Sequence, residues 1–273
     1  MNTYKTSPRS LVASLYRNRQ LLLDLALRET TSRHKGSALG IFWTLLTPLF
    51  LLCIYTFIFS EIFKSRWPDL NDASKASFAI ILFSGLIAFN FFSECLSRAP
   101  SVIVANQNFV KKIIFPLEIL PCVTLLSALI QFLISLAILF VFQIILMGRI
   151  PLTALLAPLA FLPLFMLTLG LSWFLAAAGV YIRDIGHTIG LILTALLFLS
   201  PIFFPLSSFP EEWRHFASLN PLALPIEQLR NVIVFSKGLD MSYMLYYTAF
   251  ALIIMWLGYW SFQASRRGFA DVI

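Results

Sequence analysis

Six long stretches of this chain contain no charged residue, and this feature limits the chain to one class of protein. The stretches run from 18 to 33 residues. A helix needs about 20 mainly apolar residues to cross the hydrocarbon core of a bilayer. The sequence therefore predicts an all-α integral membrane protein with six transmembrane helices, at about residues 38–60, 76–93, 119–147, 152–180, 185–207 and 241–264.

Composition supports this class. Hydrophobic residues make up 59% of the 273 residues and charged residues 12%, against about 45–50% and about 25% in soluble domains. This excludes a disordered chain and argues against a soluble enzyme. Cys53, Cys95 and Cys122 lie in or beside apolar stretches and form no C-x-x-C pair. Neither a zinc site nor a disulfide framework is therefore expected.

The basic residues predict the orientation in the membrane. With a cytoplasmic N-terminus, the inner segments hold 13 of the 20 Lys and Arg residues and the whole net charge of +7. Because cytoplasmic loops are enriched in Lys and Arg, both termini are predicted to be cytoplasmic. Residues 1–35 then form a cytoplasmic segment, 36–265 a single transmembrane domain and 266–273 a cytoplasmic tail. The positive-inside bias and attraction to anionic lipid explain the basic charge, so no nucleic-acid partner is expected.

An amphipathic segment precedes the first span. At 100° per residue, polar and apolar side chains of Leu11–Arg28 fall on opposite sides. This pattern predicts an N-terminal helix that lies in the membrane interface. The alternative is an ordinary helix that packs on the cytoplasmic ends of the bundle.

A second amphipathic segment, residues 211–238, lies between spans five and six. Its helical part from Ile226 to Phe235 reaches only ~15 Å, half a bilayer. A short apolar piece, Trp213–Leu219, precedes it. We expect an external re-entrant helical hairpin that gates an exit; the alternatives are a plain external loop or a static platform. The candidate gate residues are Trp213, Phe216, Leu222, Ile226, Leu229 and Ile233.

The chain lacks the patterns that would carry chemistry of its own. It has no G-x-x-x-x-G-K-[ST] phosphate loop and no nucleophile elbow, and its three histidines lack metal-ligand spacing. Asp and Glu are absent from the middle of every predicted span, which argues against a proton- or sodium-coupled carrier. We expect no catalytic, cofactor or metal site, and energy from a partner subunit. A membrane enzyme remains as the alternative, with Glu211, Glu212 and His215 as its one acidic and histidine cluster.

Three groups of polar residues on the predicted cytoplasmic side are candidates for binding. Two loops are candidates for contact with the partner, although they could instead be solvated, and Asp184 could cap the following helix. A cationic cluster before span one is a candidate for a lipid headgroup, or else an anchor for topology. The loop residues are Asn106, Lys111, Lys112, Arg183 and Asp184; the cluster is Arg33, His34 and Lys35.

Aromatic side chains mark the last candidate site. Trp43, Phe50 and Phe57 lie within about 40° of one another on the first span. Such a face stacks on sugar rings, or packs on lipid and neighbouring helices. Phe203 and Phe204 at the end of span five complete this set of channel residues. Gly186-x-x-x-Gly190 is a weak signal for a close helix contact.

Several motifs occur in one order along the chain. Residues 33–40 read R-H-K-G-S-A-L-G, followed by Trp43 and Pro48. This start resembles that of the polysaccharide-exporting ABC transporter permeases. Further similar motifs are Asn106 through Lys111-Lys112 with residues 115–121, residues 181–185, residues 200–205, and residues 219–222 with Arg230. The resemblance covers residues 11–268.

The resemblance implies a homodimeric channel with two copies of a cytoplasmic ABC ATP-binding subunit, which would hold ATP and Mg. It implies export of glycan on undecaprenyl pyrophosphate across the bacterial inner (cytoplasmic) membrane. Lipopolysaccharide O antigen is the expected cargo. Capsule or teichoic acid export, or a non-glycan drug or lipid permease of the same class, are the alternatives.

Overall fold

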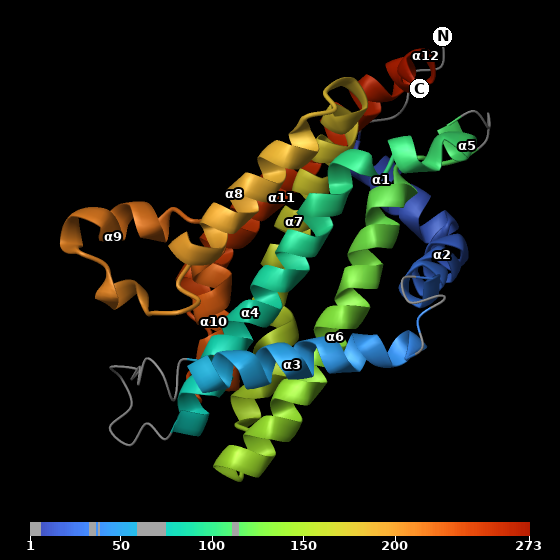
Figure 1. Ribbon diagram of the computed structural model, residues 1–273. Coiled ribbons are helices and arrows are strands. Elements are labelled where there is room, and N and C mark those ends of the chain that lie inside the picture. The colour runs from blue at the N-terminus through green and yellow to red at the C-terminus, as the bar shows by residue number, and fades with distance from the viewer. Residues whose placement is uncertain (1–6, 33–36, 38, 59–74, 111–114) are drawn as a thin grey trace.

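The computed structural model describes residues 7–32, 37, 39–58, 75–110 and 115–273, and these residues form helices without any strand (Figure 1). Four helices in this part are long and apolar enough to cross a membrane. The prediction of an all-helical, multi-pass membrane protein is thereby confirmed. The four helices are α4 (Lys75–Arg98), α6 (Ile119–Met147), α7 (Ala157–Tyr181) and α11 (Met241–Ser265).

The two other predicted spans are shorter helices. α3 (Trp43–Phe57) and α8 (Ile185–Leu199) have 15 residues each, or ~22 Å. α3 contacts α4 and α6 and runs across them in Figure 1. α8 stops at Ser200, whose backbone is extended because Pro201 follows. The count of six spans stays a prediction.

Small residues and stacked rings hold the long helices together. A Cβ added to Gly258 of α11 would lie 1.9 Å from the Gly170 carbonyl oxygen of α7, so the two backbones touch. In the same core, the rings of Phe132 and Phe161 stack at 3.9 Å, and Phe91 meets Phe161 edge-on at 4.8 Å. α4, which carries Phe91, is the most buried of the long helices.

The N-terminal amphipathic segment forms two helices, α1 (Pro8–Arg17) and α2 (Arg19–Ser32). Leu22, Ala26 and Thr30 of α2 are buried, and the Thr30 hydroxyl lies 3.0 Å from that of Ser127 on α6. α2 therefore packs on the bundle, as the alternative expectation had it. An exposed apolar row also runs along α1 and α2, so placement at the membrane interface stays a prediction. This row consists of Val12, Tyr16, Leu23 and Leu27.

The ends of the bundle differ in the elements that they carry. α1, α5 (Gln107–Val110), α12 (Phe269–Val272) and the α7–α8 turn lie together at the upper end in Figure 1. α10 (Ala223–Ile233) lies level with the lower half of α4, while α9 (Glu211–Ser218) projects sideways. Short 3₁₀ turns connect these elements: η1 (Gly40–Phe42), η3 (Ala99–Ser101), η4 (Val104–Asn106), η5 (Leu152–Leu156), η6 (Leu206–Ser208) and η7 (Arg266–Gly268).

Candidate functional site

The two loops proposed to contact a partner begin side by side. A Cβ on Gly179, near the end of α7, would lie 2.1 Å from the Pro100 carbonyl oxygen of η3. Only glycine permits this approach, because any side chain would overlap the η3 backbone. The structure thus joins the connection after α4 to the α7–α8 turn at one end of the bundle.

The residues of these loops differ in their surroundings. Arg183 and Asp184 are exposed in the turn. The Asp184 side chain makes no capping hydrogen bond to α8, so the alternative role as a helix cap lacks support. Asn106 is half-buried and its Nδ2 donates to the Val102 carbonyl at 2.8 Å. Lys111 and Lys112 lie outside the described residues.

A buried ion pair organises the same end. Arg266 Nη1 donates to Glu118 Oε2 at 2.6 Å, with side chains 12% and 8% exposed. The Ser14 hydroxyl donates to Glu118 Oε1 at 2.8 Å, and Trp173 Nε1 to the Glu118 carbonyl at 2.9 Å. Arg266 Nη2 also donates to the Phe115 carbonyl. Glu118 therefore links α1, the start of α6, α7 and η7.

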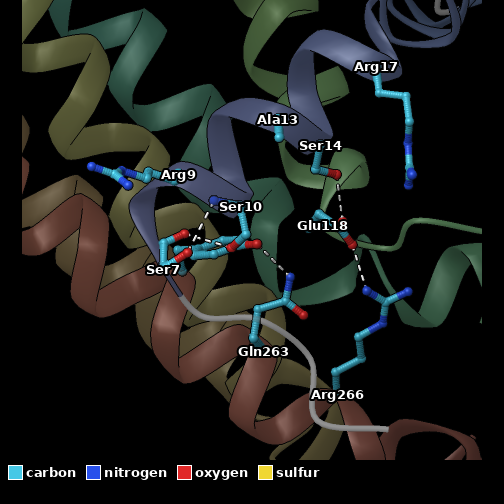
Figure 2. Close-up of a pocket in the computed structure, with 10 residues that line it drawn as sticks. Ser7, Arg9, Ser10, Ala13, Ser14, Arg17, Glu118, Gln263 and Arg266 are labelled. Atoms are coloured by element: carbon cyan, nitrogen blue, oxygen red, sulfur yellow. Dashed lines mark hydrogen bonds and ion pairs between the residues drawn. The ribbon is translucent and has the colours of Figure 1, made fainter.

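A cavity of about 530 Å³ opens beside this ion pair, between α1 and the end of α11 (Figure 2). It contains serine hydroxyls and three arginines, together with the Glu118 carboxylate. The cationic cluster Arg33, His34 and Lys35 lies outside the described residues. The cavity is lined by Ser7, Arg9, Ser10, Ala13, Ser14, Arg17, Glu118, Tyr259, Gln263 and Arg266.

The predicted aromatic face is on the surface of α3. Trp43, Phe50 and Phe57 are all exposed. Phe203 does not join them; it meets Tyr55 of α3, with ring centroids 6.2 Å apart. Phe204 packs edge-on against Phe209. The outward face of α3 is thus available to lipid, substrate or a second subunit.

A cavity of about 410 Å³ with a mainly apolar lining and a few polar groups lies under α3, between α4 and α6. Trp43 is on its rim, and Asn90 and Gln131 bring amides into it. Gln131 Nε2 donates to the Thr44 carbonyl at 2.8 Å, which ties α6 to α3. Amide groups beside an aromatic ring can hold a hydroxylated ligand.

The apolar stripe of the hairpin faces inward. Leu222, Ile226, Leu229 and Ile233 are buried, and α10 packs on α4 and α7. Trp213 on α9 is 62% exposed, and the side chain of Phe216 is outside the described part of the chain. The stripe on α10 therefore holds this segment to the bundle, and α9 presents the exposed ring of Trp213.

Hydrogen bonds of Arg230 hold α10 against neighbouring parts of the protein. Its side chain is 2% exposed, and its guanidinium donates to the carbonyls of Ile81, Pro201 and Ile202. The Nε bond to Ile81 is 3.0 Å long. Burial lowers the pKa of Arg230 to about 9, a shift that Glu227 opposes, so the guanidinium is charged at neutral pH. Arg230 thereby joins α10 to α4 and to the end of α8.

Sequence reasoning assigned no role to Glu118, Arg266 or Arg230. The sequence carries a signal for two of these three residues. Glu118 is an acid directly before an apolar span, where a charge must find a partner. Arg230 is four residues after Ile226 and so shares the buried face of its helix. Among the described residues, no group of three His, Cys, Asp or Glu side chains is placed to hold a metal ion.

The ABC-2 type transporter family matches residues 20–234, most of the chain. The chain belongs to this family. It is a membrane permease of this family, whose members lack an ATPase domain. The resemblance inferred from the ordered motifs is confirmed.

Individual relatives match nearly end to end. The O-antigen export system permease protein RfbA of Myxococcus xanthus is 28% identical, over 96% of this chain and 99% of that protein. An RfbA of Klebsiella pneumoniae is 24% identical, over 93% and 95%. The polysialic acid transport protein KpsM of Escherichia coli is 28% identical, over 84% and 88%.

Proposed function

We propose that this permease is the channel-forming subunit of an ATP-driven exporter of lipid-linked polysaccharide. Its cargo is lipopolysaccharide O antigen on undecaprenyl pyrophosphate, moved out of the cytoplasm across the bacterial inner membrane. Two copies of the chain form the channel, and two copies of an ATP-binding subunit supply the energy. Both chain termini are cytoplasmic.

The outward aromatic face of α3 is the observation that carries this proposal. Trp43, Phe50 and Phe57 are exposed together on one face of an apolar helix, and flat aromatic rings can stack on the apolar faces of sugars. In a dimer they are placed to line a path between subunits, where flat rings hold sugar faces without fixing them tightly. The relatives named for O-antigen export support the same cargo.

The other candidate residues take roles in the export cycle. Arg183 and Asp184, with Asn106, Lys111 and Lys112, receive motion from the ATP-binding subunits. Arg33, His34 and Lys35 attract the pyrophosphate headgroup. α9, with Trp213 and Phe216, closes the exit at rest, held in place by the buried stripe of α10. Phe203 and Phe204 border the channel.

A capsule exporter is the second candidate, because a polysialic acid transport protein covers 84% of this chain. A drug or lipid permease of the same class is a further alternative. The three differ in what accumulates when the permease is absent. O-antigen export predicts undecaprenyl-linked O antigen in the cytoplasmic leaflet.

Deletion of the gene, followed by analysis of lipid-linked glycans, tests the proposal. Accumulated O-antigen intermediate supports it; capsule precursor favours the second candidate, and unchanged glycan pools contradict both.

Complementation with W43A/F50A/F57A tests the aromatic path, and F174A is the control, because Phe174 is an exposed ring on α7. We expect export to fall with the triple variant alone. An enzyme of glycan assembly would instead turn over substrate when purified without any ATPase.

A further inference from the structure

The cavity beside Glu118 has a charged rim and a polar floor. Arg9 and Arg17 of α1 are exposed at the rim, and serine hydroxyls of α1 lie between them (Figure 2). Glu118, Tyr259 and Gln263 are buried at the floor. The lining holds three arginines and one carboxylate, and Arg266 already pairs with that carboxylate. The remaining cations at the rim favour an anion.

The buried residues at the floor of the cavity favour a ligand that also has a hydrogen-bond donor. Gln263 is 4% exposed, and its Nε2 donates to the Tyr259 hydroxyl at 2.9 Å. Its Oε1 is buried and has no hydrogen-bond donor among the described residues. A buried acceptor without a donor is costly, so a ligand with a hydroxyl group would be stabilised there. The cavity thus fits a molecule that has both an anionic group and hydroxyls.

An apolar groove adjoins this cavity on α1. It has a volume of about 490 Å³ and is lined by Arg9, Val12, Ala13 and Tyr16. Arg9 and Ala13 also line the polar cavity, so the two spaces meet along one side of α1. Val12 and Tyr16 are largely exposed apolar side chains. A charged polar site next to an apolar groove matches an amphiphile better than a soluble anion.

We propose that this cavity binds the headgroup of an anionic phospholipid with a hydroxylated headgroup, of the phosphatidylglycerol class. The phosphate accepts hydrogen bonds from Arg17 and is attracted by the charge of Arg9 at the other end of the rim. A headgroup hydroxyl donates to Gln263 Oε1, and an acyl chain follows the groove along Val12 and Tyr16. Binding holds α1 against the Glu118–Arg266 ion pair. This site is separate from the cargo path, and the inference holds whichever glycan is exported.

Native mass spectrometry of the full chain in detergent tests the site, with dioleoylphosphatidylglycerol as the probe. We expect a retained lipid adduct that R9Q/R17Q weakens about tenfold or more, because hydrogen bonds to charged groups are lost. R28Q is the single-charge control, since Arg28 is exposed on α2 and does not line the cavity. Equal weakening by R28Q would show unspecific attraction of lipid and would overturn the proposal.

Two further arms identify the ligand chemistry. Q263L should weaken phosphatidylglycerol binding several-fold but leave phosphatidic acid, which lacks headgroup hydroxyls, unchanged; equal loss of both lipids contradicts the assigned floor contact. Soluble glycerol 3-phosphate should not displace the lipid at equal concentration. Displacement would make the site one for a free phosphate instead. Unchanged melting of each variant without lipid shows that folding is intact. If R9Q/R17Q melts at a different temperature, the single variants R9Q and R17Q replace it, and each should weaken the adduct several-fold.

Discussion

The Glu118 carboxylate lies 2.6 Å from the Arg266 guanidinium, an ion pair between residues 148 positions apart. Both side chains are nearly buried, and Glu118 also accepts a hydrogen bond from Ser14. The pair joins the start of α6 to the end of α11 and receives α1 at the same point. It therefore sets the geometry of the end of the bundle that carries α1 and α12.

Removal of one partner should destabilise the protein strongly. In E118Q, Arg266 keeps its charge and loses the carboxylate, which for a buried pair costs about 3–5 kcal/mol. Unfolding of the detergent-solubilised protein by denaturant measures the loss. E94Q is the control: Glu94 pairs with the partly exposed Arg98 at 3.6 Å, and such a pair contributes about 0–1 kcal/mol. Similar losses in both variants would contradict a special role for Glu118.

Replacement of Arg230 should loosen the hairpin. R230K keeps a positive charge but cannot reach three carbonyl oxygens at once, because an ammonium lacks the guanidinium fork. Each hydrogen bond to a charged group contributes about 1.5–3 kcal/mol, so we expect faster proteolysis between α8 and α10 and a lower melting temperature. R214K is the matched control, since Arg214 is exposed and donates to carbonyls at 3.2 and 3.3 Å. If R230K had the same proteolysis rate and melting temperature as the unaltered protein, Arg230 would not anchor the hairpin.

The contact between α7 and α11 should not tolerate a methyl group. The new Cβ of G258A would overlap the Gly170 carbonyl at 1.9 Å, and overpacking of this kind costs about 1–3 kcal/mol. G190A on α8 is the control, because its added Cβ has no neighbour within 4 Å in the described part of the chain. Thermal unfolding in detergent should show a loss for G258A and none for G190A. The reverse order would mean that the helices pack differently.

Export should depend on the exposed α7–α8 turn. R183A/D184A removes two exposed charges that we propose to contact an ATP-binding subunit, so we expect assembly or ATP-dependent export to fall. D24A/R28A on α2 removes the same types of charge from exposed positions and should preserve export. Glycan export in cells and co-purification of the ATP-binding subunit provide the measurements. Full assembly and export by R183A/D184A would defeat the coupling proposal.

The hairpin should respond to transport. W213C places a thiol on exposed α9, whereas L229C places one in the core, where burial protects it. An impermeant maleimide added outside should label W213C faster during export than at rest, and should label L229C slowly in both states. Equal labelling of W213C in the two states would favour a static platform over a gate.

Sequence alone was sufficient for properties that depend on neighbouring residues. Charge-free runs predicted the long helices, and helical spacing predicted an apolar stripe from Leu222 to Ile233. The stripe was assigned to a gate, whereas the structure buries it against the bundle. Ordered motifs led to the family. Each of these is a local pattern, because helix formation and membrane insertion depend on residues within about 20 positions.

Tertiary structure alone decided which distant groups meet. Gly186 and Gly190 have the spacing of a helix contact, yet no atom of the described residues lies within 4 Å of a Cβ added to either, while Gly170 and Gly258 touch without any motif. Likewise, Glu118 forms an ion pair with Arg266, which lies 148 positions later in the chain. Such contacts depend on how whole helices pack, and helical periodicity tells which face of a helix is apolar but not which neighbour covers it.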